Sequence, residues 1–175
     1  ALVLFLTVLG RWTTGARLPA VALGNLLGGF AMLALLWWLR LRASAAGIGP
    51  RFGRTVGANR WARAGIVFLL VQVALGGLVS ASHSALACVT VPDCQGSWWP
   101  PGATFEARNP WREPSASAAQ AGASAEAALH MTHRALALLT GVVGVAAGLH
   151  GIRAGGRYRH AGLLLLGLLL AEIVL

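Results

Sequence analysis

The stretch LPAVALGNLLGGFAMLALLWWLRLR, residues 18–42, decides the fold class of this chain. It holds no charged side chain before Arg40, so it is long enough to cross a bilayer as a helix, which takes about 20 apolar residues. Trp37 and Trp38 stand just before its arginines, an order typical of the boundary between lipid and water. The stretch therefore predicts a membrane-spanning helix over residues 18–39 that ends at an interface.

Apolar runs of the same kind recur along the chain. Two are full spans and two are partial: Ala64–Ser80 and Leu129–Ile152, then Ala1–Trp12 and Ala161–Leu175. Of all residues 57% are hydrophobic and 11% are charged, whereas soluble domains carry about 25% charged residues. We therefore predict an all-α fold, a polytopic bundle of transmembrane helices. Because both ends of the sequence fall within the partial runs, we expect a truncated piece, cut inside a helix at each end.

The arginines orient these helices. All 14 basic residues are arginines, and the formal net charge is +9. Cytoplasmic loops of membrane proteins carry an excess of basic residues. Most of the arginines lie in or beside two loops: Arg40, Arg42, Arg51, Arg54, Arg60, Arg63, Arg153, Arg157 and Arg159. We predict that these two loops are cytoplasmic and that the loop 81–128 is extracytoplasmic. Because the arginines flank apolar runs, they favour membrane topology over nucleic-acid binding.

The long outer loop contains both cysteines of the chain, Cys88 and Cys94. An oxidising compartment and their short spacing favour a structural disulfide that shapes the loop. A redox-active pair is the alternative, although membrane thiol oxidoreductases typically use two cysteines separated by two residues.

The run Ala-Leu-His-Met-Thr-His-Arg contains the strongest candidate ligands, His130 and His133. Being three residues apart, they lie on one face of a helix. Small residues continue that face: Ala137, Gly141, Gly144 and Gly148. A smooth stripe beside an imidazole suits a flat macrocycle with an axial histidine, and it equally suits close helix packing. Another metal is a third alternative. Arg134 is placed to neutralise a propionate or to reach the lipid headgroups.

Other polar residues are weaker candidates. Asn25 is the only strongly polar side chain in the body of its predicted helix, and it is either an interhelical hydrogen-bonding group or part of a site shared with His133. His83, His150 and His160 stand at predicted helix ends, where interfacial residues are more typical than ligands.

At these residues the chain resembles the haem A synthase family. The resemblance rests on three parts of the sequence: Leu75-Gly-Gly-Leu-Val-Ser80 with the following loop, including Ala85-Leu-Ala-Cys88 and Pro92-Asp-Cys94-Gln-Gly-Ser-Trp98-Trp99-Pro100-Pro101; His130-Met-Thr-His133-Arg134; and Leu26-Leu-Gly-Gly29, in a helix ending Leu36-Trp37-Trp38-Leu39. Together they span most of the chain, and the cysteine loop followed by a His-Arg pair is fairly specific. The long loop with prolines and tryptophans looks like the proteobacterial branch.

The resemblance implies an eight-helix protein built from two pseudo-symmetric four-helix halves. This chain would hold the third through the seventh helix. Residues 1–42 would end the N-terminal half, residues 43–63 would form a basic cytoplasmic loop, and residues 64–175 would form the truncated C-terminal half. The protein would lie in the bacterial inner membrane and oxidise a methyl group of haem O to a formyl group, giving haem A for terminal oxidases.

The resemblance also implies roles for particular residues and partners. His133 corresponds to an axial ligand of a haem b cofactor. Beside it, we expect His130 and Arg134 as further cofactor-binding residues from their spacing and charge. Cys88 and Cys94 correspond to cysteines that form a disulfide in relatives. Haem O would be the substrate, and a separate donor would supply electrons. Haem O synthase, oxidase assembly factors and a second copy of the chain are the remaining candidate partners.

The chain departs from the family pattern at Asn25, where the family normally has a histidine. An amide is a poor axial ligand for haem iron. The loop also reads Cys-Val-Thr-Val-Pro-Asp-Cys, where relatives commonly have Pro-Asp directly after the first cysteine. The family's functional glutamate lies outside this chain, so we expect the fragment alone to be inactive. The alternatives are a b-type haem-binding membrane protein, a degenerate homologue without synthase activity, a membrane thiol oxidoreductase, and a pore or transporter.

Overall fold

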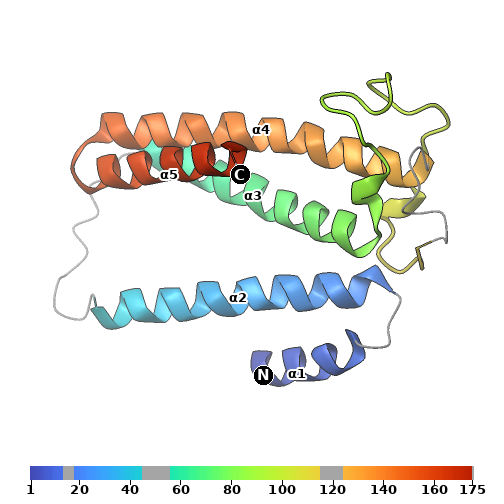
Figure 1. Ribbon diagram of the computed structural model, residues 1–175. Helices are drawn as coiled ribbons and strands as arrows, with labels where there is room; N and C mark the ends of the chain where they lie inside the picture. Colours follow the sequence, from blue (N-terminus) through green and yellow to red (C-terminus); the bar gives the residue numbers. More distant parts are fainter. Residues whose placement is uncertain (14–17, 45–55, 115–123, 175) are drawn as a thin grey trace. The chain divides into compact units, whose positions relative to one another are not determined.

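The computed structural model describes residues 1–13, 18–44, 56–114 and 124–174. Across these ranges the regular structure is entirely helical: α1 (Leu2–Thr13), α2 (Pro19–Ser44), α3 (Val56–Ala81), the short 3-10 helices η2 (Ser84–Leu86) and η3 (Glu106–Arg108), α4 (Ser124–Ala154) and α5 (Gly156–Val174) (Figure 1). The all-α prediction is confirmed.

Three stretches of helix in the described ranges are long and apolar enough to cross a membrane: Pro19–Ser44, Arg60–Ala81 and Ser124–Ala154. They coincide with the three full spans that the sequence predicts. The partial runs at the two ends are also helical. The first of them is a shorter apolar helix, Leu2–Trp12, and the second lies within α5.

The helices begin earlier than the apolar runs predict. The first residues of α3, α4 and α5 are Val56, Ser124 and Gly156, five to eight residues before each run. Hydropathy identifies only the apolar part of a helix, whereas the hydrogen-bonded backbone continues beyond it. In α4 the extra turn includes alanines and Glu126, and an acidic residue in the first turn suits the positive end of the helix dipole. The predicted loop 81–128 therefore ends in a turn of helix.

Packing divides the chain into two compact units. The first comprises Ala1–Arg51 and Val73–His133, and the second comprises Phe52–Gln72 and Arg134–Leu175. Helices α3 and α4 thus contribute residues to both units. This division follows contacts within the chain, and the predicted boundary between two halves at residues 43–63 stays a prediction.

In the first unit, α1 and α2 lie side by side (Figure 1) and approach closely at two glycines. A Cβ atom added at Gly24 would lie 2.9 Å from Leu9 Cδ2, and one added at Gly28 would lie 2.5 Å from Leu6 Cδ2. The glycines therefore let leucines of α1 enter the surface of α2, a packing mode common between membrane helices.

The loop that contains the two cysteines packs onto helix ends of the same unit. One buried cluster joins the end of α3, the loop and the start of α4: Leu78, Val79, Ala107, Ala125 and Leu129. The start of α2 is also attached, because the backbone N–H of Ala20 donates to the Pro110 carbonyl oxygen at 2.8 Å. The described part of the loop, residues 82–114, therefore packs onto the helices and is more than a plain connector.

In the second unit, α4 and α5 form an antiparallel hairpin. The turn uses Gly155 and Gly156, whose φ angles of 73° and 51° lie in the left-handed region that glycine adopts readily. The two helix backbones then approach closely, since a Cβ added at Gly162 would collide with the Gly148 carbonyl oxygen. Small residues at this crossing are what allow the hairpin to close.

Candidate functional site

The predicted ligand His133 lies in α4 against the backbone of α3. A Cβ atom added at Gly76 would lie 3.0 Å from His133 Cε1 and 3.6 Å from its Nε2. A residue with a side chain would press on the imidazole at this point, so Gly76 forms a cradle for the ring. Both residues belong to the first unit. The sequence marks Gly76 within the Leu75-Gly-Gly stretch, but it gives no sign of this contact.

The next residue, Gly77, contacts a different helix. A Cβ added there would lie 2.7 Å from Leu26 Cδ2 and 3.0 Å from Leu23 Cδ1, both in α2. Helix α3 therefore uses two successive glycines to contact α4 and α2 at one level. Asn25 is partly buried and lies between the two leucines in sequence. It consequently occupies the same level along α3 as His133.

The other predicted cofactor-binding residues flank His133 in α4. His130 stands one turn earlier and is partly buried. Its chain neighbours Leu129 and Met131 are buried in the packing of the outer loop. Arg134 follows His133 directly, is partly buried, and belongs by packing to the second unit. Cofactor binding by His130 and Arg134 stays a prediction.

The small-residue stripe that continues from His133 is partly covered. A Cβ added at Gly144 or Gly148 would lie 2.9 or 2.7 Å from a leucine side chain of α5. At Gly141, by contrast, an added Cβ would meet nothing within 4 Å among the described residues. The distal glycines Gly144 and Gly148 thus serve helix packing, one of the two functions that the sequence left open. A flat ligand beside the stripe stays a prediction.

The two cysteines of this loop form the predicted bond. Cys88 and Cys94 are joined by a disulfide with an S–S distance of 2.03 Å. Both sulfurs lie in a buried cluster with Ala87, Ala127 and Met131. The disulfide therefore packs against the first turns of α4, the helix that also carries His133. This packing fits the structural interpretation of the pair.

A second contact between the loop and α4 is absent from the sequence predictions. Arg108 Nη2 donates a hydrogen bond of 2.5 Å to Thr132 Oγ1, and this hydroxyl in turn donates to the Ala128 carbonyl oxygen at 2.7 Å. The guanidinium carbon lies 3.9 Å from the centroid of the Phe105 ring. The sequence identifies Arg108 only as a loop charge, because a partner 24 residues away leaves no periodic signal.

The remaining histidines lie in two kinds of surroundings. His83 and His160 are exposed. His150 stacks on Trp61 with ring centroids 5.4 Å apart, and its Nδ1 lies 2.8 Å from the Ala146 carbonyl oxygen. That these three are interfacial residues rather than ligands stays a prediction.

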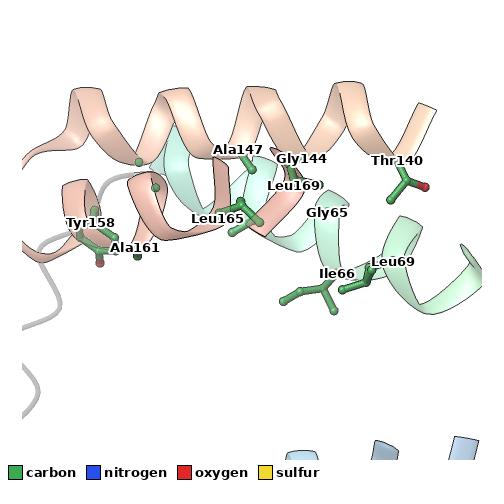
Figure 2. A pocket seen from close by; sticks show the side chains of 13 residues that line it. Gly65, Ile66, Leu69, Thr140, Gly144, Ala147, Tyr158, Ala161, Leu165 and Leu169 are labelled. Atoms are coloured by element: carbon green, nitrogen blue, oxygen red, sulfur yellow. The ribbon is translucent and has the colours of Figure 1, made fainter. Parts of the chain in front are cut away.

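The second unit contains an apolar cavity of about 320 Å³, seen in Figure 2 between parts of α3, α4 and α5. Its lining is mostly aliphatic or glycine, and its polar side chains are Thr140 and Tyr158. The Thr140 hydroxyl already donates to the Leu136 carbonyl oxygen at 2.8 Å. None of the predicted ligands lines the cavity, and in the described part of the chain no three His, Cys, Asp or Glu side chains cluster to hold a metal ion.

Fold and site together define a multi-pass membrane protein in which a glycine-cradled histidine lies in the helix that a disulfide-braced loop packs against. Residues 1–175 match the model of the COX15-CtaA family, described as cytochrome oxidase assembly protein, and the chain belongs to this family.

One curated relative illustrates the likeness. The chain is 33% identical over 142 residues to a protein of Shewanella oneidensis named heme A synthase, an alignment that covers 79% of this chain and 43% of that protein. The chain thus spans less than half the length of this relative. No solved structure matches the chain.

Proposed function

We propose that the protein is a haem A synthase, a membrane oxidoreductase that converts a methyl group of haem O to the formyl group of haem A. The observation that carries this proposal is the 33% identity with the heme A synthase of Shewanella oneidensis over 79% of the chain. The match of residues 1–175 to a family of cytochrome oxidase assembly proteins supports a role in supplying terminal oxidases.

The surroundings of His133 fit a haem cofactor, which we take to be haem b. Imidazole is a common axial ligand of haem iron. Gly76 leaves the ring space directly against the α3 backbone, where any side chain would press on it. When bound, haem b supplies a redox-active iron. His133 would hold that iron, and the charge of Arg134 suits a propionate of the same group.

We further propose the arrangement of the chain in the bacterial inner membrane. Residues 1–42 would end the N-terminal half that handles haem O, residues 43–63 would form a cytoplasmic loop, and residues 64–175 would belong to the C-terminal half that holds the cofactor. The arginine-rich loops support this orientation. The disulfide supports an extracytoplasmic position for the cysteine loop, because such bonds persist in oxidising compartments.

The reaction needs further components. Electrons would come from a separate donor, because the sequence of this chain carries no nucleotide-binding motif. The functional glutamate of the family would lie in a helix outside this chain, so the fragment alone would be inactive. Haem O synthase and oxidase assembly factors are the expected protein partners, and a second copy of the chain is another.

The proposed activity is tested by haem analysis. The complete gene is expressed together with a haem O synthase in a host that makes no haem A, and the extracted haems are separated by chromatography and identified by mass. We expect haem A to appear. Haem O alone, with the protein detected in the membrane, would contradict the synthase assignment.

Asn25 favours a second candidate function, a b-type haem-binding protein or a degenerate homologue without synthase activity. Its amide stands where the family has a histidine, and it lies at the level of His133 along α3. If the N-terminal site is merely impaired, Asn25→His is expected to raise haem A yield several-fold in the same co-expression assay. An Asn25→Gln control, which keeps an amide, should give no gain. Haem O alone from both the wild type and Asn25→His would favour the second candidate.

A further inference from the structure

The loop segment Phe105–Trp111 is fastened to the outer ends of three helices in the first unit. Ala107 is buried among residues of α3 and α4, including Leu129. The Pro110 carbonyl oxygen accepts a hydrogen bond from Ala20 at the start of α2. A segment held on several sides in this way can fix the positions of the helix turns that it contacts.

Within this segment, Arg108 contacts the residue of α4 that directly precedes the candidate ligand His133. Its Nη2 donates to the hydroxyl of Thr132, the residue immediately before His133. The guanidinium also stacks on an aromatic ring, because its carbon lies 3.9 Å from the centroid of the Phe105 ring. Its buried Nε makes no hydrogen bond among the described residues. A hydrogen bond from a charged donor is stronger than a neutral one.

The turn of α4 that carries His133 is thus held from two directions. Gly76 of α3 gives the imidazole its space, and Arg108 of the loop holds the adjacent Thr132. The Thr132 hydroxyl passes this restraint to the helix backbone through its bond to the Ala128 carbonyl oxygen. A shift of this turn would move the imidazole relative to the α3 backbone.

We propose that Arg108 is a positioning residue for His133, acting through Thr132 to keep the imidazole in the orientation that haem-iron ligation requires. This inference rests on the proposed function, because it takes His133 to be a haem ligand. Outer contacts that orient a metal ligand typically change metal affinity by about 10- to 100-fold when they are removed.

A second loop arginine provides a matched control. Arg112 forms an ion pair of 3.3 Å with Glu106, and the two side chains are 36% and 66% exposed. Exposed ion pairs contribute little to stability. Arg112→Gln therefore removes one positive charge from the same loop, together with an ion pair inside the loop rather than a hydrogen bond to Thr132.

The test uses the complete protein, purified with its haem. Arg108→Gln and Thr132→Val remove the two ends of the contact, whereas Thr132→Ser keeps the hydroxyl. We expect the first two variants to lose haem to apomyoglobin about tenfold faster than the wild type, and to show shifted g values in the electron paramagnetic resonance (EPR) spectrum of the ferric haem. Thr132→Ser and Arg112→Gln should resemble the wild type, and the Arg108→Gln/Thr132→Val double variant should be no worse than either single one.

Two results would overturn the inference in distinguishable ways. Unchanged haem loss and unchanged g values in Thr132→Val, compared with Thr132→Ser, would remove the positioning role while leaving His133 as a ligand. The comparison of Thr132→Val with Thr132→Ser tests the positioning role even if the Arg108→Gln protein fails to accumulate in the membrane. Full haem content in His133→Ala would instead remove the proposed ligand itself, and with it the basis of the inference.

Discussion

Replacement of His133 by alanine is expected to remove bound haem b from the complete protein. The substitution deletes the imidazole that we assign to the iron and leaves an apolar side chain against the Gly76 backbone. Since an alanine offers no donor atom, iron ligation from α4 at this position is lost altogether. The measurement is the ratio of haem b to protein after purification, determined from the reduced pyridine complex of the extracted haem.

A histidine elsewhere in the chain provides the control for this loss. His83 is exposed and has a φ of 59°, a left-handed conformation that asparagine tolerates better than most residues. His83→Asn is therefore expected to keep the full haem content. A haem-to-protein ratio that stays at the wild-type value in His133→Ala would rule out ligation there.

Enlarging Gly76 is expected to have an effect nearly as large, although that residue donates nothing to iron. A Cβ at this position would lie 3.0 Å from His133 Cε1, so Gly76→Ala must displace the ring by a few tenths of an ångström. We expect about tenfold weaker haem retention in Gly76→Ala. Gly76→Leu should abolish haem binding, because its longer side chain competes with the imidazole for the same space. Haem content and the rate of haem loss measure both effects.

Two other glycines of α3 make this prediction specific to the imidazole. Gly77→Ala introduces an even closer contact, 2.7 Å from Leu26 Cδ2, but with the flexible ends of Leu23 and Leu26. At Gly65 an added Cβ meets nothing within 4 Å in the described part of the chain. Both alanine variants should keep their haem. If Gly77→Ala lost haem as readily as Gly76→Ala, the loss would reflect disturbed helix packing in general and not contact with the His133 imidazole.

The fold could be predicted to a large extent from the sequence, because the signal for a membrane span is both long and local. The apolar runs that begin at Leu18, Ala64 and Leu129 all correspond to spanning helices of the structure. The helix starts could not be predicted as well, since the early turns of α3 and α5 carry arginines and lie outside the apolar pattern. Hydropathy identifies only the part of a helix that lipid can surround, whereas the helix itself continues beyond that part.

The candidate site could be predicted only in its most local features. His133 stands out because an ionisable group in a span is costly and is usually functional. Its surroundings depend on packing between segments far apart in the chain, which leaves no periodic trace. Two such contacts between distant segments are the close approach of Gly76 to the His133 ring and the hydrogen bond from Arg108 to Thr132. The sequence likewise could not show that Gly144 and Gly148, in the small-residue stripe of α4, pack against leucines of α5.

The measurement that tests the central claim most directly is the EPR spectrum of the ferric haem in the complete protein and in a His133→Met variant. A thioether is also an axial ligand of haem iron in proteins, but it differs electronically from imidazole. If His133 binds the iron, the variant should retain haem and show clearly altered low-spin g values. A fully loaded variant with the wild-type spectrum would contradict ligation by His133.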